Sequence, residues 1–376
     1  MRLISFFLIL VFFSFDIYAV DTKAEQAIVI DFDTNEILYE KNIYEKIPPG
    51  SMTKIMTVYA AFDRIEKTDL SINDLCIISP KSYKMGGSRT FLEIDDKVTI
   101  DDLLKGIIVQ SGNDASVALA ECLGGTESDF SKLMNFYAET LGMKNTNFIN
   151  TSGWPNDNHY STVYDLGILS NAIIRDFPNL YNYFKYEEFI YNDIKQPNRN
   201  KLLKNVLGAD GLKTGYTKKS GWGIAGSAIR NNRRITVVIN GTNSSRSRLN
   251  ESTYLINWAF NQTSQQKLLS QGQIIKYVDV WLGNQPTINL ISNQDIMSIL
   301  SFDQLKLIKS NIIYNSPISA PIKKGDILGK IEINIPGKKK ITVPLIAEKS
   351  VNEINPLLRI FAALKYLIFG TSLDEI

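Results

Sequence analysis

The sequence predicts an α/β (α+β) protein, in which an antiparallel sheet flanked by helices is followed by a small all-β domain and a C-terminal amphipathic helix. Strand-like segments open the chain, apolar helical runs fill its middle, and consecutive strand-like segments follow. This order fits a sheet whose first and last strands are distant in sequence. From about Gln262 to Asn352, short alternating apolar runs replace the helical pattern, which indicates the all-β domain.

The first domain is predicted to span residues 22–261 and to begin with a hairpin. Ala27–Asp31 and Glu36–Glu40 have strand-like patterns, with a turn signal at Asp33–Asn35 between them. Leu255–Phe260 predicts a closing helix. Three segments predict consecutive strands, with a turn at Asn231-Asn232 before the last: 210–217, 221–228 and 234–240.

The second domain is predicted at residues 262–352. Tyr277–Leu282 alternates apolar and polar residues in the manner of a half-buried strand. Turn signals follow at Gly283-Asn284, Lys324-Gly325-Asp326 and Pro336-Gly337. No combination of residues in this domain predicts catalysis.

Composition excludes several classes of function. The 376 residues carry a net charge of +2, which gives no indication of nucleic-acid binding. His159 is the only histidine, so a Ser-His-Asp triad would have to use it. One histidine and two cysteines leave no cluster for a typical zinc site, and we expect neither a metal nor a cofactor. Because a single cysteine pair in so long a chain is no disulfide framework, we expect Cys76 and Cys122 to be free, buried thiols.

The first of three motifs with catalytic potential is Ser-Met-Thr-Lys at residues 51–54. Pro48-Pro49-Gly50 interrupts the chain before it, and a helix-compatible run follows. Ser51 then lies at a helix N-terminus, where free N–H groups favour developing negative charge. Lys54 lies on the same helix face as Ser51 and can act as a general base where burial lowers its pKa. The pattern alone is weak, because it recurs at Ser264–Lys267.

The second motif is Ser-Gly-Asn at Ser111–Asn113. Apolar runs at Leu103–Val109 and Ala115–Cys122 flank it, which places Ser111 and Asn113 on a short connection between two buried helices. Such connections on a rigid scaffold often carry functional groups. The alternative role for Asn113 is to cap the following helix, and the two roles are compatible.

The third motif is Lys-Thr-Gly at Lys213–Gly215, within a predicted strand. Gly215 allows another backbone or a ligand to approach closely. An ordinary strand with an exposed lysine is the alternative interpretation. The three motifs together supply a nucleophile, two candidate bases and a cationic anchor without a histidine, and three such motifs in this order rarely coincide by chance.

In these motifs the chain resembles the low-molecular-mass penicillin-binding proteins, specifically the D-alanyl-D-alanine carboxypeptidases of peptidase family S11. The resemblance covers roughly residues 22–370. Segments beyond the motif triplets also match: Gly86–Ser88, Leu104–Gly106, Gln110–Ala115, Gly153–Pro155, His159–Thr162, Gln196–Asn200 and Gly211–Thr217. It implies a serine β-lactamase/transpeptidase-like catalytic fold, and a structural role for the segment that contains His159.

The resemblance also implies catalytic roles. Ser51 would be the acylated nucleophile, and Lys54 would be its general base. Ser111 and Asn113 would relay protons and hold the substrate amide. The backbone N–H groups of Ser51 and Tyr216 would form the oxyanion hole.

Substrate binding is implied at the third motif. Lys213 and Thr214 would bind the terminal carboxylate of the substrate, with Gly215 and Tyr216 beside them. Arg248 stands where this family often has an arginine near the carboxylate pocket.

The activity expected from this resemblance is removal of the terminal D-alanine from peptidoglycan stem pentapeptides, with β-lactams as covalent inhibitors. A DD-endopeptidase or transpeptidase would use the same groups. Class A β-lactamases use a glutamate between the second and third motifs, and Glu187-Glu188-Phe189 does not resemble that segment. A non-enzymatic scaffold that binds peptidoglycan is the most distant alternative.

The termini predict export and membrane attachment. Residues 1–19 have Arg2, an apolar stretch and a small residue at Ala19, as in a cleaved signal peptide. Residues 354–370 are apolar with two cations; they are too short to span a bilayer and fit a helix lying in the interface. We expect a peripheral protein on the outer face of the bacterial cytoplasmic membrane, with the β domain as a spacer or as a binding site for another envelope component.

Overall fold

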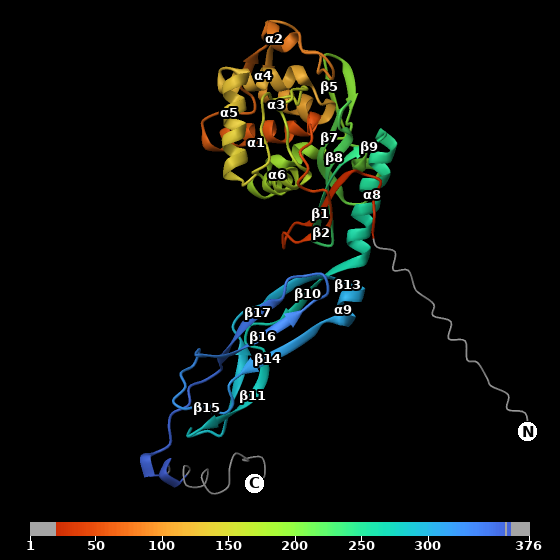
Figure 1. Cartoon of the computed structure of the whole chain (residues 1–376). Helices are drawn as coiled ribbons and strands as arrows, with labels where there is room; N and C mark the ends of the chain where they lie inside the picture. The colour runs from red at the N-terminus through yellow and green to blue at the C-terminus, as the bar shows by residue number, and fades with distance from the viewer. Residues whose placement is uncertain (1–19, 358, 362–376) are drawn as a thin grey trace, which may run out of the picture. The chain divides into compact units, whose positions relative to one another are not determined.

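The computed structural model describes residues 20–357 and 359–361 of the chain, and Figure 1 shows its helices and strands. Chain contacts divide it into two units. The first contains the residues to Val29, Tyr39–Ile229 and Thr236–Trp258. The second contains Ile30–Leu38, Arg230–Ile235 and the residues from Ala259 onward.

A five-stranded sheet in the order β2-β1-β9-β8-β7 is the framework of the first unit. Its strands are β1 (Gln26–Asp31), β2 (Ile37–Lys41), β7 (Ala209–Thr217), β8 (Gly221–Arg230) and β9 (Arg233–Thr242). β7 and β8 are antiparallel, with Lys213 opposite Ala225. Asn231 and Asn232 have φ angles of 49° and 62°, as the tight turn of a two-residue hairpin requires. The predicted antiparallel sheet is confirmed, with β1 beside β9.

Helices cover this sheet, and Figure 1 shows α1–α6 on one side of it and α8 on the other. The first ten residues of α1 are all buried, so this helix forms the centre of the helical layer. The helix bounds are α1 Lys54–Lys67, α2 Pro80–Tyr83, α3 Ile100–Lys105, α4 Asn113–Gly124, α5 Glu127–Thr140, α6 Val163–Asp176, α7 Leu202–Asn205 and α8 Ser245–Gln262.

Shorter elements connect these helices to the sheet. They are the 3-10 turns η1 (Gly50–Thr53) and η3 (Leu180–Lys185), the π-helical turn η2 (Gly106–Gln110), and the two-stranded pairs β3 (Leu75–Ile77) with β4 (Lys97–Thr99) and β5 (Glu188–Tyr191) with β6 (Ile194–Pro197).

The cysteine prediction is wrong, because Cys76 and Cys122 form a disulfide. Cys76 lies on β3 and is buried, whereas Cys122 lies in α4 and is exposed. Their Cα atoms are 5.5 Å apart, which is within the usual range for a disulfide. The number of cysteines in a chain does not reveal that two residues 46 positions apart face each other across a strand and a helix.

The second unit is mainly β structure, as predicted. Its six-stranded sheet has the order β14-β16-β17-β12-β11-β15, and β10 pairs with β13. The element bounds are β10 Thr263–Leu269, β11 Ile274–Trp281, β12 Thr287–Ser292, β13 Ile296–Ser301, α9 Phe302–Leu307, β14 Lys309–Tyr314, β15 Ile318–Ser319, β16 Ile327–Asn334 and β17 Ile341–Ala347. Alternate apolar residues of these strands, including Leu290 and Leu345, form a separate core.

The predicted terminal segments lie largely outside the described residues. The proposed signal peptide at 1–19 is outside them, and of the proposed helix at 354–370 only 354–357 and 359–361 are described, with helical turns at 356–357 and 359–361. Among the described residues, no helix combines the length and the apolar character needed to cross a membrane.

Candidate active site

Ser51 lies in η1, the single turn that leads into α1. Gly50 before it has a φ of 53°, and a Cβ there would lie 2.9 Å from the carbonyl oxygen of Tyr216. Glycine is therefore needed for this turn to pass so close to β7. The three-residue spacing places Lys54 Nζ 3.1 Å from Ser51 Oγ.

Lys54 is completely buried, and its amine is held by two further oxygen atoms. Nζ donates to Asn113 Oδ1 at 2.7 Å and to the Ser152 carbonyl oxygen at 2.5 Å. Burial, reinforced by the charge of Arg199, lowers the pKa of Lys54 from 10.5 to about 7. A neutral amine has two N–H bonds, which these two oxygens accept. Its lone pair then remains available for the hydroxyl proton of Ser51.

The second motif lies between two buried helical segments, as the apolar pattern predicted. Ser111 follows η2 with a φ of 69°, and α4 begins at Asn113. Asn113 Nδ2 donates to the Gly86 carbonyl at 2.8 Å, and its backbone N–H donates to the Ser88 carbonyl at 2.8 Å. These two bonds fix the amide so that its oxygen faces Lys54. Such π-helical turns recur at functional sites.

The third motif lies on β7, the edge strand of the sheet. Thr214, Gly215 and Tyr216 line the same pocket as Ser51. A Cβ on Gly215 would lie 2.6 Å from the Pro49 carbonyl oxygen, so only glycine allows η1 to pack against the strand here.

Lys213, in contrast, lies behind the pocket wall and is 2% exposed. Burial lowers its pKa well below the ordinary value, and the positive charges of Lys54, Arg199 and Arg248 add to this effect. Its one hydrogen bond to a described residue goes from Nζ to the Thr214 carbonyl oxygen, at 3.4 Å. Lys213 is therefore one of four neighbouring basic side chains, and its environment disfavours its charged form.

Of the basic residues predicted in the site, Arg248 lines the pocket, whereas Lys54 and Lys213 do not. Its guanidinium lies over the Trp222 ring, 5.4 Å from the ring centroid, and Nη2 is 3.4 Å from Ser245 Oγ. Burial lowers the pKa of Arg248 to about 10, so it remains a cation at neutral pH. Arg199 and Lys201 line the same pocket.

The pocket has a volume of about 490 Å³. It is lined by Ser51, Gly87, Ser88, Ser111, Asn113, Ser152, Gly153, Trp154, Pro155, Arg199, Lys201, Thr214, Gly215, Tyr216, Trp222, Ser245 and Arg248. These include every predicted site residue except Lys54 and Lys213, which lie just beneath the surface. All charged side chains in the lining are cations, so the pocket suits a ligand with a carboxylate.

Sequence reasoning missed two functional features of this pocket. Arg199 lies in Gln196–Asn200, one of the segments that resemble the family. A cationic residue in such a segment could have been predicted as part of the site. Ser152 contributes its backbone carbonyl to Lys54, and a backbone group leaves no signature in the sequence.

Asn150 holds the turn that presents the Ser152 carbonyl. Its Oδ1 accepts from the backbone N–H groups of Ser152, Gly153 and Trp154, at 3.2, 2.8 and 3.0 Å. An asparagine that satisfies three successive N–H groups fixes the local backbone. We refer to residues 150–154 as the Asn150 turn.

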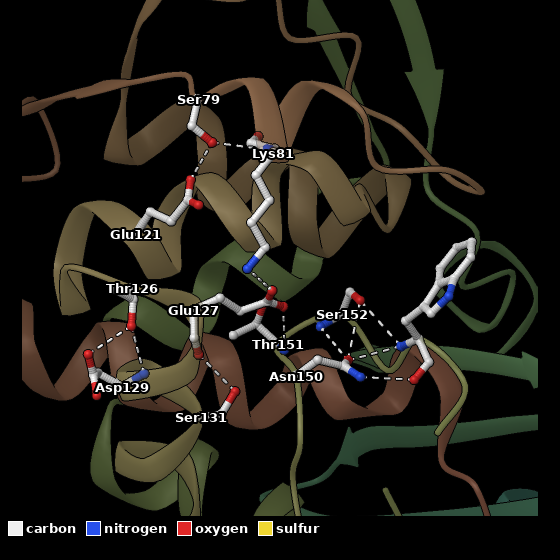
Figure 2. A network of polar contacts seen from close by, with 12 residues as sticks. Ser79, Lys81, Glu121, Thr126, Glu127, Asp129, Ser131, Asn150, Thr151 and Ser152 are labelled. Carbon is white, nitrogen blue, oxygen red and sulfur yellow. Dashed lines mark hydrogen bonds and ion pairs between the residues drawn. The ribbon is translucent and has the colours of Figure 1, made fainter. Parts of the chain in front are cut away.

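An ion pair between Glu127 and the exposed Lys81 supports the Asn150 turn from α5 and α2, as Figure 2 shows. Glu127 Oε1 accepts from the backbone and the hydroxyl of Thr151, and Glu127 Oε2 pairs with Lys81 at 2.7 Å. The turn that carries the Ser152 carbonyl, a hydrogen-bond partner of Lys54, is thus linked to two helices, α2 and α5.

His159 is buried beside the site and has a structural environment. Its Nδ1 accepts from the Ile149 backbone N–H at 3.1 Å, and its Nε2 is 2.8 Å from Thr53 Oγ1. Burial and the nearby Lys54 charge lower the pKa of His159 to about 4, so the ring is neutral at pH 7. In the part of the chain that the structure describes, no group of acidic, histidine or cysteine residues has a metal-binding arrangement.

Comparison with known proteins agrees with this geometry. Residues 15–243 match the family described as D-alanyl-D-alanine carboxypeptidase, and residues 264–353 match the penicillin-binding protein 5 C-terminal domain. The chain is 34% identical to D-alanyl-D-alanine carboxypeptidase DacC of Escherichia coli, over 89% of this chain and 85% of that protein. It is 34% identical to DacF of Bacillus subtilis, over 88% and 86%.

Solved structures give the same result. DacD from Francisella tularensis superposes with a TM-score of 0.79 at 28% identity, over 89% of this chain and 95% of that one. Penicillin-binding protein 5 from Haemophilus influenzae gives 0.71 at 31% identity, over 89% and 99%. The chain therefore belongs to the D-alanyl-D-alanine carboxypeptidase family of penicillin-binding proteins.

Proposed function

We propose that this protein is a serine-type D-Ala-D-Ala carboxypeptidase that removes the terminal D-alanine from peptidoglycan stem pentapeptides. One observation carries the proposal: Ser51 Oγ is 3.1 Å from a buried lysine whose pKa is about 7. This pair opens into a pocket whose charged lining residues are all cations. The site thus joins an activated nucleophile to a carboxylate-binding wall.

In the acylation step, Ser51 Oγ attacks the carbonyl carbon of the penultimate D-alanine and its proton passes to Lys54. The C–N bond then breaks, and the leaving D-alanine takes a proton from the site as it departs. Ser111 and Asn113 line the same pocket as Ser51, which supports a role in this proton transfer and in holding the substrate amide. The backbone N–H groups of Ser51 and Tyr216 would stabilise the oxyanion.

The terminal carboxylate of the substrate would bind at Thr214 and Arg248, with Gly215 holding β7 close to the turn that carries Ser51. Lys213 would act from beneath the wall, where the negative charge of a bound carboxylate would favour the ammonium form that burial opposes. This arrangement explains why the enzyme would act at a chain terminus: an internal residue has no carboxylate to offer these cations.

In deacylation, water adds to the ester carbonyl and gives up a proton to the site. The ester C–O bond then breaks, Ser51 Oγ takes up that proton, and the shortened peptide leaves. A β-lactam would acylate Ser51 in the same way, but the leaving nitrogen belongs to a ring fragment that stays attached to the acyl group and cannot depart. We therefore expect slow release of penicillin.

The test is to incubate the mature protein with L-Ala-γ-D-Glu-L-Lys-D-Ala-D-Ala and to measure free D-alanine. We expect stoichiometric D-alanine and tetrapeptide from the wild type, and neither product nor a penicillin adduct from Ser51→Ala. Cross-linked product, or cleavage of a preformed cross-bridge at a higher rate, would contradict carboxypeptidase as the main activity.

Features outside the Ser51 pocket support an exported location. The Cys76–Cys122 disulfide suits an oxidising compartment, and residues 1–19 read as a signal peptide. Leu357, Ile360 and Phe361 are exposed apolar residues at the start of the proposed terminal helix. They support peripheral attachment to the outer face of the cytoplasmic membrane, with the β domain as a spacer.

A further inference from the structure

A second groove, of about 640 Å³, adjoins the Ser51 pocket. Trp154, Pro155 and Tyr216 line both spaces. Beyond these shared residues, the groove is formed by the segment before η1, by residues 156–160, and by the chain that follows β7. A peptide that occupies the Ser51 pocket can therefore continue into this groove.

The groove has an excess of positive charge. Lys46, Lys218 and Lys219 line it, and Asp157 is the single carboxylate residue in its lining. All four are exposed. Within the described part of the chain, no carboxylate lies within salt-bridge distance of these three lysines. Lys46 Nζ instead lies 4.2 Å from the centroid of the Tyr160 ring.

The position of two of these lysines follows from the strand that carries the third motif. β7 is the edge strand of its sheet and runs from Ala209 to Thr217. Lys218 and Lys219 follow directly, in the turn to β8. A substrate peptide that lies along an edge strand exchanges backbone hydrogen bonds with it. The residues of such a peptide that extend past Tyr216 then reach Lys218 and Lys219 in the turn.

We propose that this groove binds the acidic segment of the substrate peptide, that is, the carboxylates N-terminal to the scissile bond. The inference rests on the proposed carboxypeptidase function and assigns a specificity role to Lys218 and Lys219, supported by Lys46. Ammonium groups in exposed positions recognise carboxylates as point charges, and each such pair is worth only a few-fold in affinity. The groove therefore tunes substrate preference, whereas the Ser51 pocket performs the reaction.

The test compares two pentapeptides that differ by one charge: L-Ala-γ-D-Glu-L-Lys-D-Ala-D-Ala and the same peptide with the α-carboxylate of D-glutamate converted to its amide. Release of D-alanine gives kcat and KM for each. We expect the wild type to prefer the acidic peptide, and Lys218→Gln/Lys219→Gln to lower kcat/KM for it about three- to tenfold through KM. The amidated peptide should change less than twofold.

The matched control is Lys144→Gln/Lys185→Gln, which removes two exposed lysines of the same unit outside the groove lining. It should leave both peptides unaffected, and raising the ionic strength should reduce the wild-type preference. Equal kinetics for the two peptides in the wild type, or an equal loss for both in the groove variant, would overturn the inference while leaving the activity established. Absence of D-alanine release from either peptide would instead contradict the proposed function.

Discussion

At the residue scale, the chemistry depends on what burial does to Lys54. A lysine removed from water loses much of its preference for the charged form, and here its pKa falls to about 7. Sequence spacing was enough to predict that Lys54 faces Ser51, because both lie on one helical path. The hydrogen-bond partners of the amine were harder to predict from the sequence: Asn113 was predicted from its motif, whereas the Ser152 carbonyl was not.

The pH dependence of acylation follows from this pKa. Lys54 accepts a proton only when neutral, so the rate of acylation by a β-lactam should rise with pH, with a midpoint near pH 7, and level off about one unit above that midpoint. Asn113→Asp would put a negative charge where Oδ1 now lies, 2.7 Å from Lys54 Nζ. That charge stabilises the ammonium form, so the midpoint should move up by about one pH unit or more. Stopped-flow measurement of covalent labelling gives the profile.

Asn113→Ala is the control for this prediction, because it removes the same oxygen without adding charge. It should slow acylation, yet it should not raise the midpoint. Identical midpoints for the wild type and Asn113→Asp would show that the titration observed is not that of Lys54.

At the element scale, the Asn150 turn links helix packing to the position of a catalytic partner. Asn150→Ala would remove the acceptor of the Ser152 and Gly153 N–H groups and leave the Trp154 N–H with the Ser152 hydroxyl alone. The Ser152 carbonyl would then be free to move away from Lys54. We expect acylation to slow on the order of tenfold, since small displacements at a reacting centre are costly. Asn150→Asp keeps an oxygen acceptor and should recover most of the rate. Equal loss in both variants, with unchanged thermal stability, would refute a role for the turn in positioning.

The disulfide joins β3 to α4. β3 carries no predicted catalytic residue, and α4 carries only Asn113, at its start. The disulfide closes a segment of 46 positions, and cross-links of this span stabilise by about 2–4 kcal/mol. Reduction with dithiothreitol should therefore lower the unfolding midpoint of the wild type, while Cys76→Ala/Cys122→Ser should already be lowered and should not respond. Penicillin labelling by either folded form should be retained. A midpoint unaffected by reduction would contradict a stabilising role.

At the scale of the whole molecule, sequence patterns predicted the sheet, its helical cover and the β domain, because these depend on periodicity and turn residues. The hairpin at Asn231-Asn232 and the helix-to-helix connection at Ser111 were both read correctly from local sequence. The disulfide and the position of Arg199 were not, because each depends on which distant segments the fold brings together. The second Ser-x-x-Lys copy shows the same limit: Ser264 pairs with Leu300 across strands β10 and β13, so its lysine shares no helix face with it.

The predicted membrane attachment also concerns the whole molecule. It can be tested with two pairs of equally exposed apolar residues in the second unit. Leu357 and Phe361 are 69% and 71% exposed, and Tyr277 and Ile327 are 67% and 71% exposed. If the terminal helix inserts its apolar face into the interface, Leu357→Gln/Phe361→Gln should reduce sedimentation with phosphatidylglycerol–phosphatidylethanolamine vesicles about tenfold or more, since each side chain loses apolar burial. Tyr277→Gln/Ile327→Gln removes equally exposed apolar surface elsewhere and should bind like the wild type. Both variants should retain D-alanine release, because neither change touches the Ser51 pocket. Equal vesicle binding by the two variants would eliminate the terminal helix as the anchor.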